Sequence, residues 1–246
     1  MPKINIWQIN LQHSKAASDH LISEVAKAQT DTVILIQEPY LFKEIPTLKI
    51  PNSHTFYSGK NNRSILIVPR YITSWFMHNL SCRDFTTCLI QDSTGKKILL
   101  VSGYMDINYK DEEMFKYLDK IHDFAKNNNY DLIIGLDSNA HSTLWSSESN
   151  NVRGNSMDEW ILQNQLSIMN QGQIPTFVGT RGSTIIDITL TNRTHLVHDW
   201  MVNPNDQMSD HRRLEFSLDF EYRQTILTRS LNNADWEKFR KILQTT

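Results

Sequence analysis

The sequence predicts an α/β fold in which two mixed β-sheets pack face to face as a sandwich, with helices on the outside. Strand-like apolar runs alternate with helix-like segments along most of the chain, and the middle third holds several strand-like runs separated only by short turns. Strands joined through helices run parallel and strands joined by short turns run antiparallel, so both pairings are expected. The chain has 246 residues, of which 39% are hydrophobic, and this is enough for one large core.

The first elements are a strand, a helix and a second strand. Residues 4–9 are predicted to form the first strand, and Ser14 can cap a helix whose apolar residues recur at helical spacing up to Ala28. Residues 32–36 are a continuous apolar run, typical of a fully buried strand.

The middle third is predicted to be antiparallel. Asp92-Ser-Thr-Gly95 has the composition of a hairpin turn between two apolar runs. The strands expected here are residues 54–57, 64–68, 72–77, 86–91 and 98–102.

In the last third, strands and helices alternate again. Asp111 is expected to cap a helix that runs through Lys126, and a shorter helix is expected over residues 156–163. Further strands are predicted at residues 131–136, 185–190, 195–201 and 214–218. We therefore assign one domain to residues 1–220.

Residues 221–246 have a different composition. The stretch to Asn233 is polar and has no clear period, whereas Asn233, Trp236, Phe239 and Ile242 are spaced as on a short amphipathic helix. Two interpretations stay open: a linker leading into a further segment, or a C-terminal helix that docks on the core.

Composition limits the class of protein. Cys82 and Cys88 are too few and too isolated for a disulfide framework or a zinc site, so both are expected to be buried thiols in a reducing compartment. No apolar run approaches the roughly 18 residues of a membrane span, and a soluble protein is expected. A net charge of -2 argues against a protein that coats nucleic acid nonspecifically.

Polar side chains suited to phosphate-ester chemistry follow several apolar runs directly. They are Asn10, Glu38, Asp137 with Asn139, Asp187, and Asp210 with His211. A charge such as Asp187 inside an apolar strand is costly without a partner, and His211 is the natural partner. Carboxylates, carboxamides and an imidazole brought together from separate strand ends supply what metal-assisted cleavage of a phosphate ester requires.

In order and spacing, these residues resemble the exonuclease, endonuclease and phosphatase superfamily. Further stretches are similar to the apurinic-type endonuclease domains of non-LTR retrotransposons, particularly the R1-like group. These stretches are Gln8-Ile-Asn-Leu-Gln-His13, Gln37-Glu-Pro-Tyr40, Asp137-Ser-Asn-Ala-His141, Arg153-Gly154, Pro175-Thr-Phe177 and Arg181-Gly-Ser183. The resemblance runs from about Asn5 to Phe216 and implies a four-layer, DNase I-like sandwich.

The chemistry of the residues and the resemblance together predict their roles. Glu38 is expected to bind Mg²⁺, with Mn²⁺ as an alternative, because Mg²⁺ prefers oxygen ligands, and Asn10 to hold this metal or a phosphate oxygen. By resemblance, Asp137 orients and deprotonates the attacking water while Asn139 fixes its geometry.

The remaining site residues are expected to act on the phosphate. His211 would donate to a non-bridging phosphate oxygen, and Asp187 would accept its other ring proton. Asp210 is expected to bind the metal or a metal-bound water, and Tyr104 matches the family tyrosine that contacts the phosphate or leaving group.

One position departs from the family pattern. Many superfamily nucleases that repair abasic DNA carry an acid two residues after the first-strand asparagine, where this chain has Gln12. The change weakens the case for a second metal ligand and for repair activity. His13 and His141 are further candidates at the edge of the site, and for each a plain surface histidine is the alternative.

Arginines in loops near the predicted site are expected to contact DNA phosphates and to make binding salt-sensitive. They are Arg63, Arg153, Arg181, Arg193, Arg212 and Arg213. The loop over residues 173–183, with Thr176, Phe177, Arg181 and Ser183, is expected to project and to read groove shape or bases.

The function that we predict is a Mg²⁺-dependent DNA endonuclease that nicks one strand and leaves a 3′-hydroxyl and a 5′-phosphate. By resemblance, that hydroxyl primes reverse transcription of the element's RNA, the partners are double-stranded DNA and the reverse transcriptase of an RNA-directed DNA polymerase polyprotein, and the location is the nucleus. The isolated domain is expected to be a monomer. A phosphatase or phospholipase of the same superfamily and a non-catalytic DNA-binding module are the alternatives.

Overall fold

A computed structural model of the chain describes residues 3–28, 32–180, 182–205 and 208–222. One six-stranded sheet has the order β15-β16-β1-β2-β6-β5, and its neighbours are antiparallel except for the parallel pair β1 and β2. Its strands are β1 (Lys3–Asn10), β2 (Thr32–Gln37), β5 (Ser53–Phe56), β6 (Ser64–Pro69), β15 (Val197–Val202) and β16 (Leu214–Asp219).

The second six-stranded sheet has the order β11-β14-β10-β9-β8-β7, and here β9 and β10 are the parallel pair. Its strands are β7 (Thr73–Phe76), β8 (Phe85–Gln91), β9 (Lys97–Tyr104), β10 (Asp131–Asp137), β11 (Ser167–Ile168) and β14 (Asp187–Thr191). Two short hairpins complete the strands: β3 (Leu41–Phe42) with β4 (Ile45–Pro46), and β12 (Phe177–Gly179) with β13 (Gly182–Thr184).

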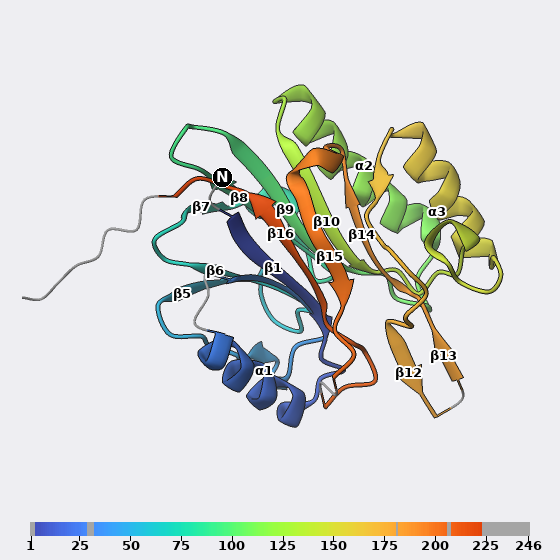
Figure 1. Cartoon of the computed structure of the whole chain (residues 1–246), viewed down its shortest axis with the longest axis horizontal. Coiled ribbons are helices and arrows are strands. Elements are labelled where there is room, and N and C mark those ends of the chain that lie inside the picture. The colour runs from blue at the N-terminus through green and yellow to red at the C-terminus, as the bar shows by residue number, and fades with distance from the viewer. Residues whose placement is uncertain (1–2, 29–31, 181, 206–207, 223–246) are drawn as a thin grey trace, which may run out of the picture.

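The helices cover the outer faces of the two sheets. Helix α1 (Lys15–Ala28) connects the parallel strands β1 and β2, and α2 (Asp111–Asn127) connects β9 and β10. Figure 1 shows α1 on the outside of the first sheet, and α2 with α3 (Val152–Gln163) on the outside of the second. This arrangement confirms the predicted four-layer α/β sandwich. None of the helices in the described ranges is both long and apolar enough to cross a bilayer.

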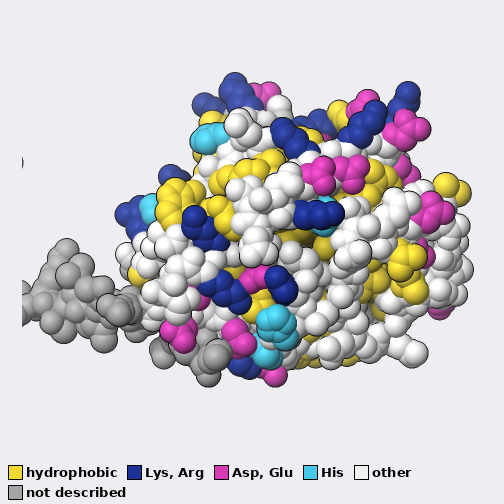
Figure 2. Space-filling view, turned by 90° about the horizontal axis from the view of Figure 1, so that it is seen from above, with side chains coloured by type: hydrophobic (Ala, Val, Ile, Leu, Met, Phe, Trp, Pro, Cys, Tyr) yellow, Lys and Arg dark blue, Asp and Glu magenta, His cyan; other side chains and the backbone are white. Residues whose placement is uncertain are grey.

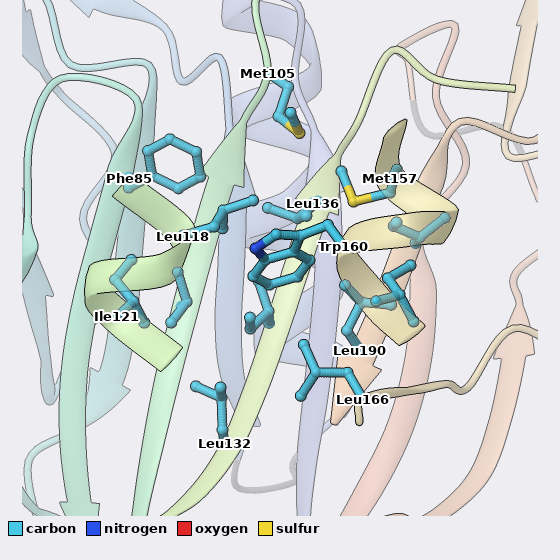
Figure 3. Packing of buried hydrophobic residues seen from close by; sticks show 14 of the residues in the cluster. Phe85, Met105, Leu118, Ile121, Leu132, Leu136, Met157, Trp160, Leu166 and Leu190 are labelled. Carbon is cyan, nitrogen blue, oxygen red and sulfur yellow. The ribbon is translucent and has the colours of Figure 1, made fainter. Parts of the chain in front are cut away.

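Apolar side chains fill the three spaces between the four layers. Figure 3 shows the core between the second sheet and helices α2 and α3. There Leu118 and Ile121 of α2 and Trp160 of α3 pack on Leu136 and Leu190 of the sheet. A second core lies between the sheets and a third beneath α1. Cys88 is buried between the sheets, Cys82 is half-buried, and both are free thiols.

Between the sheets, the inward side chains change from apolar to polar toward one end of the sandwich. In β1, Ile4 and Ile6 belong to the core between the sheets, and Gln8 and Asn10 continue the same face. Gln8 Nε2 donates to the carbonyl oxygens of Leu136 and Ile188 in the opposite sheet, at 3.1 and 3.3 Å. Asn10, the polar residue that ends β1, therefore lies at the rim of the sandwich.

A glycine allows the sheets to approach at this point. A Cβ atom on Gly135 would lie 2.7 Å from both Gln8 Oε1 and Leu35 Cδ1, closer than such contacts allow. Gln37 Nε2, which faces the same gap, donates to Ser102 Oγ at 2.9 Å. The buried amides of Gln8 and Gln37 thus link the sheets just behind the candidate site.

Several predicted boundaries differ from the structure: for example, the strand predicted to begin at residue 185 begins at Asp187, so Asp187 is its first residue and does not lie inside it. Three further differences concern the helices and the loop near the candidate site. Helix α3 begins at Val152 and not near residue 156, because the Asn151 side chain accepts from Gly154 N at 2.7 Å and caps it. Asp111 is the first residue of α2 and not its cap, and its carboxylate instead accepts from Arg153 Nε at 2.7 Å. The predicted loop over residues 173–183 contains most of the β12–β13 hairpin, which Figure 1 shows projecting from the body of the molecule.

Of residues 221–246, the structure describes Glu221 and Tyr222. Glu221 and Tyr222 continue from β16, where the Glu221 carbonyl accepts from Ser93 N at 2.6 Å and the Tyr222 ring contacts Tyr71. The predicted linker or helix beyond them lies outside the described residues.

Candidate active site

Three side chains from different strand ends meet at the rim. Asn10, the last residue of β1, donates from Nδ2 to Asp137 Oδ2 at 2.7 Å and to Glu38 Oε2 at 3.0 Å. Glu38 follows β2 directly, and Asp137 is the last residue of β10 in the opposite sheet. The predicted convergence of these segments is therefore present. A donor N–H between two carboxylates also relieves the repulsion between them.

The orientation of Asn10 differs from that of a metal ligand. Its Oδ1 accepts from Gln12 N at 2.7 Å, so the amide turns its nitrogen and not its oxygen toward the carboxylates. The oxygens of Glu38 and Asp137 are the atoms in this cluster that suit a hard cation such as Mg²⁺. Asn10 holds these two carboxylates together.

A histidine–aspartate pair adjoins this cluster. His211 Nδ1 lies 2.9 Å from Asp187 Oδ2, and His211 Nε2 lies 3.9 Å from Asp137 Oδ2. All three residues are buried. One ligand atom from each of Asp137, Asp187 and His211 lies within 4.8 Å of the others, a grouping that can hold a divalent ion. Because His211 Nδ1 is bonded to Asp187, we interpret these two as a hydrogen-bonded pair beside the Glu38 and Asp137 oxygens.

Burial and neighbouring charges strongly shift the pKa values of Asp137 and His211. Burial raises the pKa of Asp137 to about 7, and the opposing charge of His211 limits that rise. Burial lowers the pKa of His211, but the carboxylates of Asp187 and Asp137 outweigh it and raise the pKa to about 9. Near neutral pH the site therefore holds a cationic imidazole beside a carboxyl group poised to take or release a proton.

Glu38 has a strained backbone that its neighbours hold in place. Its φ of 45° lies in the left-handed region, which costs a non-glycine residue about 1–2 kcal/mol. Glu38 N donates to the Arg63 carbonyl and His13 N donates to the Glu38 carbonyl, both at 2.7 Å. His13 Nε2 also lies 3.5 Å from Glu38 Oε1. Such over-determined strain is typical of functional positions.

Asn139 and Tyr104 lie beside Asp137. Asn139 N donates to Asp137 Oδ1 at 3.3 Å, whereas its side chain donates to the Met105 carbonyl at 3.0 Å. Tyr104 ends β9 directly opposite Asp137 in the parallel register, and it is half-buried. Burial raises the pKa of Tyr104, with Glu38 and Asp137 adding to the shift, so the phenol stays protonated and can donate.

Asp210, a predicted metal ligand, does not join the buried cluster. It is exposed, and its Oδ2 accepts from Gln12 Nε2 at 3.3 Å. Gln12 Oε1 in turn accepts from Asp210 N at 2.9 Å, and Ser209 Oγ donates to the Asn10 carbonyl at 2.8 Å. Gln12 and Ser209 therefore tie the segment that carries His211 to the end of β1, a role that the sequence did not indicate.

Two arginines predicted to contact DNA are bonded within the protein: Arg153 is buried and Arg63 is partly buried. Arg63 pairs with Asp84 at 2.5 Å and with Asp106, and its guanidinium lies 4.6 Å from the centre of the Tyr104 ring. Arg153 donates to Asp111 and to the carbonyl oxygens of Met105 and Asp106. These contacts brace Tyr104 and the chain that follows it. We therefore assign both arginines a structural role in place of the predicted phosphate contacts.

Arg193 and Arg213, which were also predicted to contact DNA phosphates, are paired with acidic side chains. Arg213 Nη2 lies 2.8 Å from Glu215 Oε1, with its guanidinium stacked 3.8 Å from the centre of the Trp7 ring. Arg193 Nε lies 3.2 Å from Asp131 Oδ1. Electrostatic attraction of DNA by these side chains is correspondingly weakened.

The base of the β12–β13 hairpin is part of the site. Thr176 is fully buried, and its hydroxyl oxygen accepts from Ile186 N at 3.1 Å and from Asp187 N at 3.0 Å. The Phe177 ring meets the His211 ring edge-on, with 5.0 Å between centroids. Thr176 and Phe177 thus position the Asp187–His211 pair, and Thr176 has no surface with which to read DNA.

Other predicted DNA contacts have different surroundings. Ser183 is exposed on β13, and Arg212 is half-buried with its Nη1 donating to the Pro175 carbonyl at 3.3 Å. Arg181 lies outside the described residues. His141 is placed at the base of the same hairpin, where its Nδ1 lies 3.0 Å from Thr184 Oγ1.

Replacement of Thr176 by valine tests its positioning role. Thr176→Val keeps the shape but leaves two buried N–H groups without an acceptor, at about 1–3 kcal/mol each. The free energy of unfolding, measured by urea titration, should fall by about 2 kcal/mol or more. Thr176→Ser keeps the acceptor oxygen and should lose about 1 kcal/mol or less. Equal losses in the two variants would show that packing of the methyl group, and not the hydroxyl, fixes the start of β14.

Comparisons of the sequence with known proteins point to retrotransposon polyproteins. A family model described as endonuclease-reverse transcriptase matches residues 98–215. The chain is 24% identical over 216 residues, 83% of its length, to a putative 115 kDa protein in the type-1 retrotransposable element R1DM of Drosophila melanogaster. It is 30% identical over 152 residues, 56% of its length, to a Pol polyprotein from the type-1 retrotransposable element R1 of Bradysia coprophila. The chain spans only 21% and 15% of the lengths of these two relatives.

Solved structures show the same architecture. The endonuclease domain of TRAS1, a telomere-specific non-LTR retrotransposon, matches with a TM-score of 0.77 and 25% identity over 88% of this chain and 99% of that one. An AP endonuclease from Leishmania major matches with a TM-score of 0.72 over 88% of this chain and 87% of that one. At 13% identity, the second likeness concerns the fold alone.

Proposed function

The chain belongs to the endonuclease/exonuclease/phosphatase superfamily, as an endonuclease domain of the non-LTR retrotransposon type, and from this premise we propose that it nicks one strand of duplex DNA with Mg²⁺. The observation that carries the proposal is the meeting of Glu38, Asn10 and Asp137 with the buried His211–Asp187 pair. In this proposal, cleavage leaves a 3′-hydroxyl and a 5′-phosphate.

The side chains divide the reaction among them. Asp137 takes a proton from the attacking water, because its raised pKa near 7 suits a general base at neutral pH. Cationic His211 donates from Nε2 to a non-bridging phosphate oxygen, and Asp187 holds the ring in place. Water adds to phosphorus, the bond to O3′ breaks, and the departing O3′ takes up a proton from solvent to become the 3′-hydroxyl. A bound Mg²⁺ at Glu38 would stabilise the charge that builds on the phosphate.

We further propose that the 3′-hydroxyl primes reverse transcription by another part of a polyprotein, and that the domain acts in the nucleus. The relatives that match this chain are several times longer and come from retrotransposable elements, which supports the first part of this proposal.

Supercoiled plasmid tests the proposal directly. Purified protein with Mg²⁺ should convert it to the nicked circle, and EDTA should stop the conversion. DNA ligase should then reseal the nicks without prior treatment, since ligase needs a 3′-hydroxyl beside a 5′-phosphate. Release of phosphate from small phosphate esters without any nicking would favour a phosphatase instead, and nicks that ligase cannot seal would contradict the proposed polarity.

A further inference from the structure

A groove runs along one side of the molecule, outside the candidate active site. It lies between α2 and the segment formed by β7 and the short 3-10 helix η1 (His78–Leu80), and its volume is about 880 Å³. Its apolar lining includes Met77, Leu80 and Phe124. Met77 and Phe124 are half-buried and pack on the edge of the core between the second sheet and its helices. The groove therefore continues this core outward and leaves an apolar wall open to solvent.

The side of the groove formed by β7 is an edge of the second sheet. Among the described strands, β8 is the one neighbour of β7. Trp75 is 44% exposed on β7, and it lies on the same face as Met77 because strand side chains alternate. Lys120 Nζ on α2 donates to the Asn79 carbonyl at 2.5 Å, which ties the two sides of the groove together. A preformed apolar groove with an exposed tryptophan beside it is a surface suited to a partner.

Charge does not favour a nucleic acid as the occupant of this groove. The ionised residues that line it are two lysines and two aspartates, so their charges cancel. Figure 2 views the molecule from the end where β1 starts, and on that face Lys, Arg, Asp and Glu side chains are scattered, with hydrophobic side chains visible between them. A polyanion binds best to a concentrated positive surface. An apolar peptide segment fits the groove better.

The described part of the chain ends beside β7. Tyr222 is the last described residue, and its ring lies 5.3 Å from that of Tyr71, two residues before β7 begins. The Glu221 carbonyl accepts from Ser93 N at 2.6 Å, in the turn between β8 and β9. Figure 1 shows this stretch next to β7 and β8. The residues that follow Tyr222 therefore start at the edge of the sheet that borders the groove.

The chain beyond Tyr222 carries apolar side chains that match the groove. Residues 223–246 lie outside the described residues, and in their sequence Trp236, Phe239 and Ile242 recur at the spacing of one side of a helix. Amphipathic helices bind apolar grooves through side chains that are three or four residues apart. Aromatic side chains contribute the largest apolar areas to such contacts.

This segment is also long enough to reach the groove. Fourteen residues lead from Tyr222 to Trp236, and they can span up to about 46 Å. The five residues from Tyr71 to Phe76, which lines the groove, cover about 17 Å. Because the segment is tethered, its effective concentration at the groove is on the order of millimolar, and a weak intrinsic affinity suffices for docking.

We propose that residues 233–243 dock in this groove of the same chain as a short amphipathic helix, with Trp236, Phe239 and Ile242 against the apolar lining. The flexible thioether of Met77 adapts to such a partner. Docking removes the apolar wall from water and covers the edge of the second sheet. The inference does not depend on the proposed cleavage, because none of the residues that line the groove belongs to the candidate active site.

Hydrogen–deuterium exchange of the whole 246-residue protein tests the proposal. Backbone amides of residues 236–243 should exchange about tenfold or more slowly than those of a synthetic peptide of the same sequence. A helix this short is marginal in water by itself, so protection of these amides requires a docking surface. Exchange at the rate of the free peptide would overturn the proposal.

Variants on both sides of the contact locate it. Met77→Asp should bring the exchange of residues 236–243 to within about twofold of the peptide rate, because a charge in the groove opposes burial. In the reverse direction, the double variant Trp236→Ala/Phe239→Ala should speed exchange of the amides of His78–Leu80 about fivefold. Leu162→Asp is the matched control, because Leu162 is 80% exposed on α3 and does not line the groove, and it should change neither rate.

The remaining outcomes separate this groove from other docking sites. If a thermal melt shows that Met77→Asp does not fold, Met77→Gln tests the same contact with a smaller change. Protection of residues 236–243 that survives the substitution of Met77 would place the segment elsewhere and refute the proposal. Protection that falls when the protein is diluted would identify a second copy of the chain as the source of the groove, which contradicts docking within one chain.

Discussion

Asp137→Asn is expected to abolish nicking and yet to stabilise the fold at alkaline pH. A general base contributes about 10²–10⁴-fold to rate, and Asp137 also touches Asn10 and faces His211, so we expect a loss of about 10³-fold or more in the rate of plasmid nicking. The amide keeps the size of the carboxylate and can still accept from Asn10 Nδ2. The loss should therefore appear in kcat and not in DNA affinity.

The stability effect follows from the sign of the pKa shift. The pKa of Asp137 is raised from 3.8 to about 7, mainly by burial. The stability that comes from its neutral form is present below about pH 4 and is lost as the pH rises through 7, because the wild-type protein must then bury a charge. Asp137→Asn avoids this charge, so its Tm should exceed that of the wild-type protein by several degrees at pH 8 and by less at pH 5.

An exposed aspartate provides the control for both effects. Asp123 lies on α2 with a side chain that is 70% exposed, far from the candidate site, and Asp123→Asn should leave nicking and Tm unchanged. If Asp137→Asn retained more than a tenth of the wild-type nicking rate, Asp137 would not be the general base.

The positions of Asn10, Glu38 and Asp137 could be predicted because strands repeat every two residues. Ile4, Ile6 and Gln8 already mark the inward face of β1, and Asn10 continues it. A polar residue on that face at the end of a strand must either meet a partner or lie at the rim. The alternation of apolar and polar residues along β1 therefore predicts the location of the site from the sequence alone.

The contacts that the side chains of Arg63, Arg153 and Thr176 make inside the protein could not be predicted in the same way. The sequence shows that they lie between elements but not whether their side chains point into the protein. Arg63 is bonded to Asp84 and Asp106, which lie 21 and 43 residues further along the chain. Only the packing of the two sheets brings these residues together.

Helix α3 begins earlier than its sequence predicts for a local reason. Gly154 lies in the first turn of the helix, and in a sequence glycine usually indicates a turn or loop. A Cβ atom added at Gly154 would lie 1.7 Å from the His141 carbonyl oxygen. Glycine is present because the helix start and the segment after Asn139 approach so closely, and sequence spacing does not reveal such a contact.

The second large effect is expected when Asp187 loses its charge. Asp187→Asn can still accept from His211 Nδ1, so the ring keeps its place, but the carboxylate that does most to raise the pKa of His211 is gone. We expect nicking at pH 7.5 to fall by about 10²-fold or more, because the imidazole is then mostly neutral and a weaker donor to the phosphate.

The pH profile separates this mechanism from simple damage to the site. Asp137 must lose its proton to act as the base and His211 must keep its own, so kcat/KM of the wild-type protein should rise through about pH 7, stay high up to about pH 9 and decline above it. Asp187→Asn should move this alkaline limb toward or below the ordinary histidine value of 6.5, since burial alone lowers the pKa. Measurements from pH 6 to 10 would show the shift, and an unmoved limb would contradict the assignment of His211 as the cationic donor.

A second histidine–aspartate pair serves as the control. His198 Nε2 lies 3.0 Å from Asp219 Oδ2, where β15 and β16 lie beside the start of β1, at the opposite end from Asn10. Asp219→Asn should leave both the nicking rate and its pH profile unchanged.

Stability should also follow the linkage rule. The contribution of the His211–Asp187 pair to the free energy of unfolding is fully present below about pH 6.5 and is lost as the pH rises through about 9. The difference in unfolding free energy between wild-type protein and Asp187→Asn should shrink over the same interval. If the difference were instead constant with pH, the pair would contribute by packing and hydrogen bonding alone, and the alkaline limb of activity would need another group.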